Sequence, residues 1–385
     1  MSLAPDLAAT RDVPGRAARA AGATGGASGG VAGAGDAAGD ASGGMKAAED
    51  AAGSASDGAT GAAADWRPSA TPAALERRAT LRAAMRRFFE ARGLLEVETP
   101  LVVGAPVTDP HLQSASVDLG DGVQRWLHTS PEYAMKRLLA SGSGDIWQAC
   151  RVVRAGAERG RHHNPEFTLI EWYRRSFTLQ QMAEEAAALV DALLAAAGGR
   201  RRGVEFLSYR DALRRHTGID PLEDDLGRLR ASVADLGLET ATLAAATRDD
   251  LLDLLVATRV GPALGFGPLC ALTHYPASQA ALARLDPDDA RLALRFELYG
   301  DGLELANGFE ELADATEQAA RFEADNARRR ALGRETLPVD ARLLAALAQG
   351  LPACCGVAVG FDRVAMLAGG AASIDEILAF PLERA

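Results

Sequence analysis

The segment from Ile146 to Arg174, IWQACRVVRAGAERGRHHNPEFTLIEWYR, constrains the fold more than any other part of the chain. It contains two apolar stretches with the character of β-strands, joined by a polar loop dense in Arg, His and Asn. In the second stretch, side chains two positions apart share a face of the sheet, so Glu171 and Tyr173 should project together. A buried face with Glu and Tyr needs a polar partner. An exposed basic hairpin with a salt-bridged Glu fits the same pattern.

A second motif, RFELYGDGLELANGFEEL at 295–312, combines a predicted hairpin with several glutamates. The run Gly300-Asp301-Gly302 is typical of a tight turn between two strands. In either turn register Glu297 and Glu304 become cross-strand neighbours or nearly so, and like charges there repel unless a cation lies between them. Mg²⁺ suits this place because it binds oxygen ligands together with substrate phosphates. Two solvated glutamates on an edge strand are the alternative.

A third motif, GVAVGFDRVAML at 356–367, indicates a Gly-spaced strand that runs into a helix starting near Phe361 or Asp362. Small residues in the strand would let a ligand approach the backbone. Arg363 lies at the start of the predicted helix, where an apolar neighbourhood makes a cation costly unless it meets an anion. The motif therefore adds a candidate anion-binding arginine.

The rest of the chain predicts an α+β fold. Thr71 and Pro72 offer an N-cap and a first-turn proline for a helix ending near Gly93, with Leu81, Met85 and Phe88 on its inner face. The other predicted elements are a strand at 95–99 before Pro100, a mainly helical segment at 178–260, and strands within 268–310 and 354–360. Strands thus cluster around the polar motifs.

The large apolar side chains that a core requires begin at about Trp66. Residues 1–64 are dominated by Ala and Gly, so we expect a disordered tail at 1–64 and a folded domain at 65–385. Met45 offers a second start within the tail. The tail lacks the apolar run of a signal peptide or membrane span, and Asp6 and Asp12 fit poorly with a transit peptide. We therefore expect a cytoplasmic protein with no membrane partner.

Charge and cysteine content argue against two further classes of protein, although a local basic patch stays compatible with the overall charge. A formal charge of -11 and a pI near 5.2 argue against a protein that coats nucleic acid, because phosphate binding requires clustered Lys and Arg. The cysteines Cys150, Cys270, Cys354 and Cys355 lack paired CxxC spacing. We expect reduced thiols in or near the core rather than a zinc site or a disulfide framework.

Together these motifs resemble the three signature motifs of class II aminoacyl-tRNA synthetases, and in detail those of the lysyl branch. VETP at 97–100 is similar to motif 1, the hairpin at 154–171 to motif 2, and GVAVGFDR to motif 3. Further similar stretches are TSPEYAMKRLLASG, HNPEFTLIEWYR, HYPASQAALA, ELANGFEEL and AFPLERA. The resemblance covers about Trp66 to Ala385. It implies a class II catalytic domain, an antiparallel sheet flanked by helices, and a homodimer formed through motif 1.

The resemblance also implies ATP and Mg²⁺ as cofactors. Arg154 would hold the α-phosphate and Arg363 the γ-phosphate and the adenine face, and both would be catalytic. The metal ligands would be Glu297 and Glu304. Further residues of the ATP site would be Glu158, His163, Asn164, Leu305 and Gly360. The chain departs from the family near Glu158, because the loop between Arg154 and Gly160 is one residue longer than usual. The loop either bulges or shifts the strand register.

An amino acid with two ammonium groups would occupy the adjoining pocket, which needs carboxylates and a hydrogen-bonding aromatic group. The residues that the resemblance assigns to this pocket are Ser130, Pro131, Glu132, Glu171, Tyr173, Asn307, Phe309, Glu311 and Ala358. Among these, Phe309 would supply an apolar wall.

Lysyl-tRNA synthetases carry a β-barrel anticodon-binding domain before the catalytic domain, whereas the Ala/Gly tail lacks the alternating residues of a barrel. Ala358 stands where these synthetases usually have Gly. In both respects the chain is more similar to the truncated paralogues that modify elongation factor P. This implies activation of (R)-β-lysine, or lysine, as an adenylate and its transfer to a lysine of elongation factor P, without tRNA. The alternatives are a free-standing lysyl-tRNA synthetase and a non-catalytic amino-acid-sensing paralogue.

Overall fold

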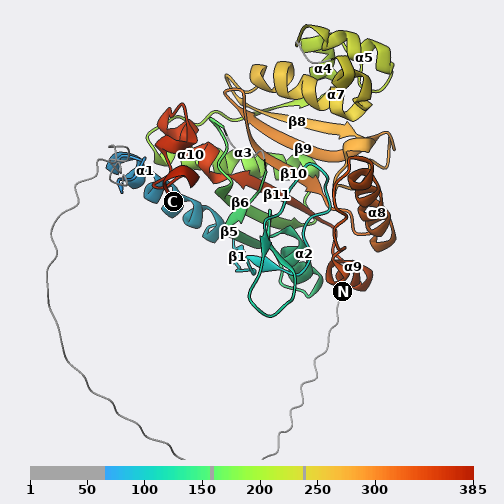
Figure 1. The fold of residues 1–385 in the computed structure, drawn as a ribbon. Helices are drawn as coiled ribbons and strands as arrows, with labels where there is room; N and C mark the ends of the chain where they lie inside the picture. The colour runs from blue at the N-terminus through green and yellow to red at the C-terminus, as the bar shows by residue number, and fades with distance from the viewer. Residues whose placement is uncertain (1–65, 157–159, 237–239) are drawn as a thin grey trace, which may run out of the picture. The chain divides into compact units, whose positions relative to one another are not determined.

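The computed structural model describes residues 66–156, 160–236 and 240–385. A mixed eight-stranded sheet forms its centre, with antiparallel inner strands and a parallel pair at each edge (Figure 1). In spatial order the strands are β1 (Leu95–Glu96), β5 (Ile146–Val153), β6 (Glu166–Arg175), β11 (Cys354–Gly360), β10 (Leu303–Glu310), β9 (Leu292–Gly300), β8 (Leu269–Pro276) and β7 (Val204–Ser208). Strands from all three polar motifs therefore lie side by side.

Both predicted hairpins are confirmed. Strands β5 and β6 pair without a register shift along their whole length, so the long connecting loop leaves them aligned. Strands β9 and β10 are joined at Asp301 and Gly302, which both have positive φ angles (50° and 77°). Positive φ at both central residues is what a two-residue turn of this kind requires, and glycine adopts it without steric cost. The aligned registers keep Glu171 and Tyr173 on one face of the sheet.

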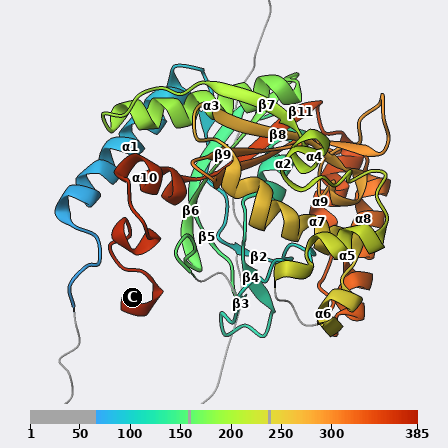
Figure 2. The same ribbon diagram turned by 90° about the horizontal axis from the view of Figure 1, so that it is seen from above.

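Helices α1 (Pro72–Glu90), α3 (Leu179–Ala196) and α10 (Phe361–Gly369) cover one face of the sheet (Figure 2). As predicted, Thr71 caps α1 by accepting a hydrogen bond from the Ala74 amide, with Pro72 in the first turn. The main core lies beneath these helices, where the Phe89 ring stacks on Trp147 at 4.5 Å. This face is apolar, so the polar side chains of β6 must point to the other.

The opposite side of the sheet carries α2 (Glu132–Ala140), α8 (Ala315–Ala331) and α9 (Ala341–Gln349), which bury Met135, Phe322 and Leu343 between them. Near β7 and β8 a separate apolar cluster forms under α4 (Tyr209–Thr217), α5 (Leu226–Ser232), α6 (Thr240–Ala245) and α7 (Arg248–Leu255). Figure 1 shows α4, α5 and α7 gathered beside β8. These two groups leave the middle of the polar face open.

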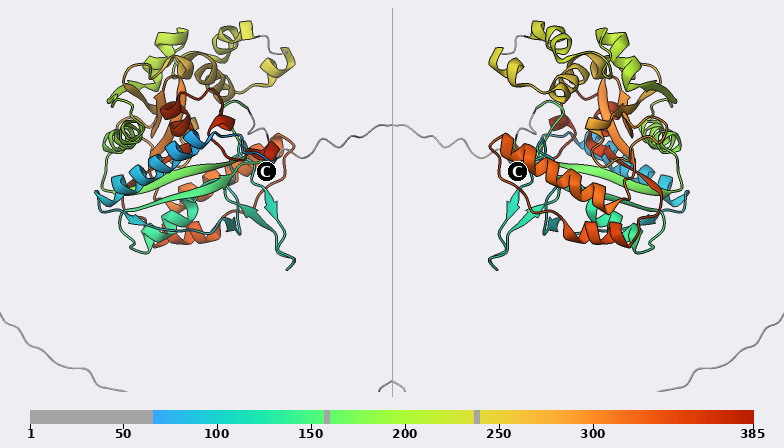
Figure 3. Two further views of the ribbon diagram at one scale, coloured as in Figure 1. Left: turned by 90° about the vertical axis from the view of Figure 1, so that its left-hand side faces the viewer. Right: turned by 90° about the vertical axis from the view of Figure 1, so that its right-hand side faces the viewer.

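A small sheet of β2 (Val102–Val103), β4 (Arg125–Leu127) and β3 (Ser116–Val117) extends from the rest of the fold, as the teal strands in Figure 3 show. The short remaining elements are 3₁₀ turns at Ala234–Leu236, Gly261–Ala263, Ala277–Gln279, Ile374–Glu376 and Leu382–Arg384, and a π turn at Val256–Val260. In the part of the chain that the structure describes, no helix has the length and apolar character needed to cross a membrane.

Most predicted elements are confirmed, with two differences. The strand predicted at 95–99 is only two residues long, and Leu95 on it is exposed. Strand β7 interrupts the segment predicted to be mainly helical, because it pairs in parallel with β8 at the sheet edge. All four cysteines are free thiols, and three of them are buried. The tail predicted at 1–64 lies outside the described residues.

Candidate active site

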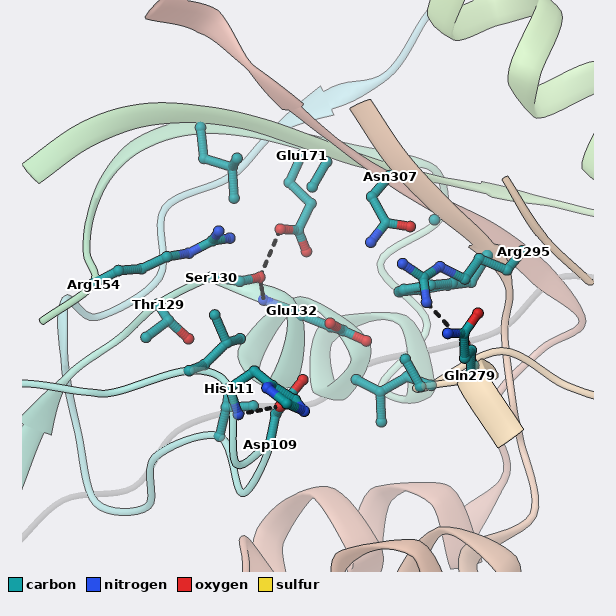
Figure 4. A pocket seen from close by; sticks show the side chains of 18 of the residues that line it. Asp109, His111, Thr129, Ser130, Glu132, Arg154, Glu171, Gln279, Arg295 and Asn307 are labelled. Atoms are coloured by element: carbon teal, nitrogen blue, oxygen red, sulfur yellow. Dashed lines mark hydrogen bonds between the residues drawn. The ribbon is translucent and has the colours of Figure 1, made fainter. Parts of the chain in front are cut away.

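A cavity of about 730 Å³ opens on the polar face of the sheet. Strands β6, β10 and β11 form its floor, and α2, α7, α8, the start of α10 and the loop at 107–112 supply its walls. In Figure 4, Arg154 points into the cavity from one side, Glu171 and Asn307 come from the sheet, and Glu132 approaches from α2. Residues from all three polar motifs thus meet in one space.

Pairing across the strands explains which side chains line the floor. Glu171 of β6 lies opposite Ala358 of β11, which lies opposite Asn307 of β10. Because directly paired residues in antiparallel strands point to the same face, these three form one row. Tyr173, Gly356 and Phe309 form the next row along the same strands. Both rows consist of residues that the sequence assigned to the amino-acid pocket, with Gly356 as an addition.

Arg154 and Arg363 bring positive charge to the same cavity. Arg154 follows β5, and its guanidinium lies 5.1 Å from the centre of the Phe167 ring. Arg363 lies in the first turn of α10, where its Nη1 donates to the Glu304 carbonyl at 2.8 Å and its Nη2 lies 2.7 Å from His163 Nε2. The two guanidinium groups can therefore act on one polyanionic ligand.

Asp362 fixes the start of α10 to the sheet. Its carboxylate is 1% exposed, accepts a hydrogen bond from the Thr168 amide at 2.6 Å and forms an ion pair with Arg78 of α1. Arg78 also donates to the Thr168 hydroxyl at 3.0 Å and lies over the Phe361 ring. Three elements are thus joined at the point from which Arg363 enters the cavity. The sequence analysis did not identify this link.

Glu304 presents the carboxylate most suited to a metal ion. Its side chain is 41% exposed and lies 3.5 Å from Arg363 Nη1. Burial by the cavity walls raises the pKa of Glu304, and the neighbouring Glu297 raises it further. A divalent cation would relieve this repulsion, so the donor chemistry fits a hard ion such as Mg²⁺. Within the described ranges, no group of three or more His, Cys, Asp or Glu is arranged to hold a metal.

Glu297 is placed differently from Glu304. Glu304 lies opposite Tyr299, two positions from Glu297, so the two glutamates are diagonal rather than direct neighbours, and a bulge between Glu304 and Ala306 sets Glu297 opposite Asn307. The Glu297 carboxylate accepts hydrogen bonds from Tyr299 Oη at 2.6 Å and from Arg295 Nη2 at 2.7 Å. It is 8% exposed and is not among the described residues that line the cavity. Direct pairing with Asn307 places Glu297 on the same face of the sheet as the floor of the cavity.

Glu171 is the most deeply held carboxylate of the amino-acid pocket. Ser130 Oγ donates to its Oε2 at 2.7 Å, and Tyr173 Oη donates to its Oε1 at 2.8 Å. Burial raises the pKa of Glu171 to about 8, and the nearby Glu132 contributes to the rise. Tyr173 is therefore a hydrogen-bonding aromatic residue on the same face as Glu171, as the strand period predicted.

Lys136 of α2 lies between two further carboxylates of the pocket. Its Nζ is 2.7 Å from Glu132 Oε1 and 2.5 Å from Glu311 Oε2, and the lysine is 1% exposed. Burial raises the pKa of Glu311 to about 7, against the opposing effect of Lys136. Although burial acts to lower the pKa of Lys136, the two carboxylates outweigh it and raise that pKa. The lysine therefore stays charged inside the pocket.

The cavity collects most of the residues that the sequence assigned to a site. Those that line it are Ser130, Glu132, Arg154, His163, Asn164, Glu171, Tyr173, Glu304, Leu305, Asn307, Phe309, Glu311, Ala358, Gly360 and Arg363. Pro131 does not line it but precedes α2 as its N-cap residue, so it contributes backbone geometry. Glu158 lies outside the described residues. The assignments remain predictions about ligands, while their convergence on one cavity is a structural finding.

The sequence analysis missed Lys136, Asp362 and Gly356. One signal for Lys136 was present, since Lys46 and Lys136 are the only lysines among the 41 Lys and Arg of the chain. A lysine in so arginine-rich a sequence indicates a site where the wider guanidinium group of arginine does not fit. Asp362 and Gly356 gave no such signal, because their partners Arg78 and Glu311 are distant in sequence.

Comparison with known proteins agrees with this geometry. Residues 60–384 match the family described as "tRNA synthetases class II (D, K and N)". Similar curated proteins are the "Elongation factor P--(R)-beta-lysine ligase" of Klebsiella pneumoniae (strain 342), 48% identical over 84% of this chain and 99% of the relative, and that of Pectobacterium atrosepticum, 47% identical over 83% and 98%. The protein of the same name from Salmonella typhimurium is 47% identical over 84% and 99%. The chain therefore belongs to the class II tRNA synthetase family of the D, K and N type.

Proposed function

We propose that this chain is an ATP-dependent amino-acid ligase that activates (R)-β-lysine, or lysine, as an aminoacyl-adenylate and transfers it to a lysine side chain of elongation factor P. The observation that carries the proposal is one cavity lined both by Arg154 and Arg363 and by the carboxylates Glu132, Glu171 and Glu311. Such a cavity suits a polyanion beside a dicationic amino acid. The names of the similar proteins identify elongation factor P as the proposed acceptor.

The first step brings two anions together. The carboxylate oxygen of the amino acid attacks the α-phosphorus of ATP, the bond to the β-phosphate oxygen breaks, and pyrophosphate leaves. Arg154, beside the amino-acid pocket, would stabilise the charge that develops on the α-phosphate. Arg363 would hold the outer phosphates from the helix start, where the α10 dipole adds positive potential. Catalysis would rest on charge and positioning and would need no general base.

The nucleotide site extends from these arginines along the cavity. His163, Asn164, Leu305 and Gly360 would contact ATP, and Glu158 would be a further contact from the motif 2 loop. Glu304 and Glu297 would hold Mg²⁺ through their carboxylate oxygens. When bound, the ion would offset phosphate charge.

The amino-acid pocket would bind the two ammonium groups through Glu132, Glu171 and Glu311. Ser130 and Tyr173 keep Glu171 in place through the hydrogen bonds given above. Asn307, in the same row as Glu171, would accept from an amine or bind the substrate carboxylate, and Phe309 would contact the aliphatic chain. Ala358 lies between Glu171 and Asn307, where its methyl group would favour the shape of a β-amino acid.

In the second step the ε-amine of the acceptor lysine attacks the adenylate carbonyl carbon. AMP leaves with the bonding electrons, the amine loses a proton, and an amide forms. The attacking amine must be neutral, and desolvation at the docking site would favour that form.

The proposal extends to the organisation of the chain. Residues 65–385 would form the class II catalytic domain. The protein would act in the cytoplasm as a homodimer, on elongation factor P rather than on tRNA. Sedimentation tests the dimer, and charging assays with tRNA test the acceptor.

The decisive experiment measures amino-acid-dependent exchange of pyrophosphate into ATP, with L-lysine and (R)-β-lysine in parallel, followed by mass analysis of elongation factor P incubated with the purified protein. Exchange together with addition of one β-lysyl or lysyl group to elongation factor P is the expected result. Exchange with transfer to tRNA instead of elongation factor P would identify a free-standing lysyl-tRNA synthetase. Absence of exchange with both amino acids would contradict the proposal.

A further inference from the structure

Lys136 combines deep burial with two short ionic contacts inside the amino-acid pocket. One contact is to Glu132, one turn earlier on α2, and the other is to Glu311, directly after β10. The lysine therefore ties a helix to the sheet across the pocket. It takes up one oxygen of each carboxylate, while Oε1 of the 95%-buried Glu311 stands against the β11 backbone at Gly356.

The charges of the pocket can be compared with those of the substrate. The three carboxylates carry three negative charges when ionised, and Lys136 cancels one of them. Within this cluster of three glutamates and Lys136, two negative charges remain, which equals the number of ammonium groups on lysine or β-lysine. Without Lys136 the pocket would hold an excess negative charge, and neighbouring carboxylates at such distances repel each other strongly in a buried site.

The residue type also carries information. Position 136 holds one of only two lysines in a chain that otherwise uses arginine for its basic side chains. An ammonium group is a compact point charge, whereas the planar guanidinium is wider and favours bidentate contacts. A compact charge can contact both glutamates at once while leaving room for the substrate amines beside them.

We propose that Lys136 is a positioning residue that sets the net charge of the amino-acid pocket, so that the pocket matches amino acids with two ammonium groups. The proposal rests on the proposed function, because it concerns the same pocket. Lys136 makes no bond to the substrate. It acts by holding Glu132 and Glu311 in fixed positions around its ammonium group and by neutralising part of their charge. Its own amine, kept protonated by the two glutamates, cannot compete with the acceptor lysine for the adenylate.

The test compares K136M with K136R. Each purified variant is assayed for pyrophosphate exchange between pH 6 and 9, and KM is determined for the amino acid and for ATP. K136M should raise KM for the amino acid about ten-fold or more at pH 7 and should move the pH of half-maximal affinity upward by about one unit, because the unneutralised glutamates hold protons more tightly. KM for ATP should stay near the wild-type value.

K136R keeps the charge and should keep the wild-type pH profile, whatever change in KM its larger head group causes. R202M is the matched control, because Arg202 is also nearly buried and paired, with Asp301 at 2.8 Å, but is not among the described residues lining the cavity. It should leave both KM and the pH profile unchanged. A wild-type pH profile in K136M, or a shifted profile in K136R, would overturn the proposal.

A second measurement does not depend on how the variants fold. Calorimetric titration of the wild-type protein with lysine or β-lysine at pH 7, in buffers of different ionisation enthalpy, counts the protons released on binding. Release of about one proton is expected, since buried carboxyl groups must ionise to face the ammonium groups. Binding without proton release would overturn the charge-matching account. The proposed function would fail differently, through a lack of exchange by the wild-type protein.

Discussion

The ring of Tyr173 occupies the space that a side chain at position 356 would need. Gly356 lies directly opposite Tyr173 in the sheet, and a Cβ atom added to it would come within 2.3 Å of both the Tyr173 ring and Glu311 Oε1. Because position 356 on β11 has no side chain, Tyr173 and Glu311 can both pack directly against the β11 backbone. Real Cβ contacts do not approach so closely, so the glycine is a requirement of the pocket geometry.

Replacement of Gly356 by alanine should disable the amino-acid pocket while sparing the nucleotide site. The added methyl group must displace Tyr173 and Glu311, so we expect KM for the amino acid to rise at least about 100-fold and stability to fall by about 1–3 kcal/mol. Exchange kinetics and urea unfolding measure these effects. Gly267→Ala is the control, because a Cβ there meets nothing within 4 Å. Equal KM values for the two variants would contradict the argument.

The sequence predicted the floor of this site well, because strand period and register are local properties. The alternation in β6 predicted that Glu171 and Tyr173 lie on one face of the sheet, and the Asp301-Gly302 turn predicted that β9 and β10 pair. The alternation of residues along β6 does not indicate which strand pairs with β6. Strand β11, which brings Gly356 beside Tyr173, is separated from β6 by about half of the chain.

Amino-acid affinity should depend on pH through Glu171 and Glu311. Burial raises their pKa values in the ligand-free protein to about 8 and about 7, from an ordinary value of 4.5. Both must ionise to bind ammonium groups, so affinity should increase as pH rises from 6 toward 8.5, by up to ten-fold per unit where one proton is released. The ε-amine of lysine stays charged over this range. Calorimetric titration at several pH values measures the effect.

The variant Glu311→Gln distinguishes the contribution of Glu311 to this pH dependence from that of Glu171. This variant should bind the amino acid more weakly, keep its affinity for ATP, and lose the part of the pH dependence that lies near pH 7. The ligand-free wild-type protein should also become less stable as pH rises through 7 and 8, because carboxyls with raised pKa values favour the folded state most at low pH. Unchanged amino-acid affinity in Glu311→Gln would count against its place in the pocket.

Arg154→Ala should abolish pyrophosphate exchange with little loss of folding stability. Arg154 lies at the open end of β5 and contributes its charge to the cavity, so its removal takes away stabilisation of the α-phosphate and leaves the core intact. Loss of a single preorganised donor of this kind typically reduces the rate by about 10²–10³-fold. Arg154→Lys should recover part of the rate, since it restores charge without the bidentate geometry. Normal exchange in Arg154→Ala would refute the assigned role.

Two features of the site could not be predicted from the sequence: a bulge within a strand, and a contact that depends on how a helix docks on the sheet. Glu297 and Glu304 were predicted as direct or near neighbours across the strands, and they form a diagonal pair, but the bulge in β10 that sets Glu297 opposite Asn307 was not predicted. A bulge of one residue leaves little trace in the pattern of apolar residues. The pairing of Lys136 with Glu311 likewise needs α2 to lie across the end of β10, which the sequence around either residue does not specify.

The link between Asp362 and Arg78 should be worth more than any surface ion pair of this protein. Asp362→Asn keeps the shape and the Thr168 contact within reach but leaves the Arg78 cation, with a side chain 13% exposed, facing an amide. Removing one partner of a buried pair costs roughly 3–5 kcal/mol, because the remaining charge stays desolvated. The matched control is Glu96→Gln. The Glu96 side chain and its partner Arg86 are both about half exposed, so this change should alter stability by less than about 1 kcal/mol.

Urea unfolding of both variants tests the difference. Exchange kinetics should show a raised KM for ATP in Asp362→Asn alone, because Arg363 follows Asp362 directly and its position at the start of α10 would no longer be fixed. Similar unfolding curves for the two variants would mean that α10 is held to the sheet by apolar packing rather than by this ion pair.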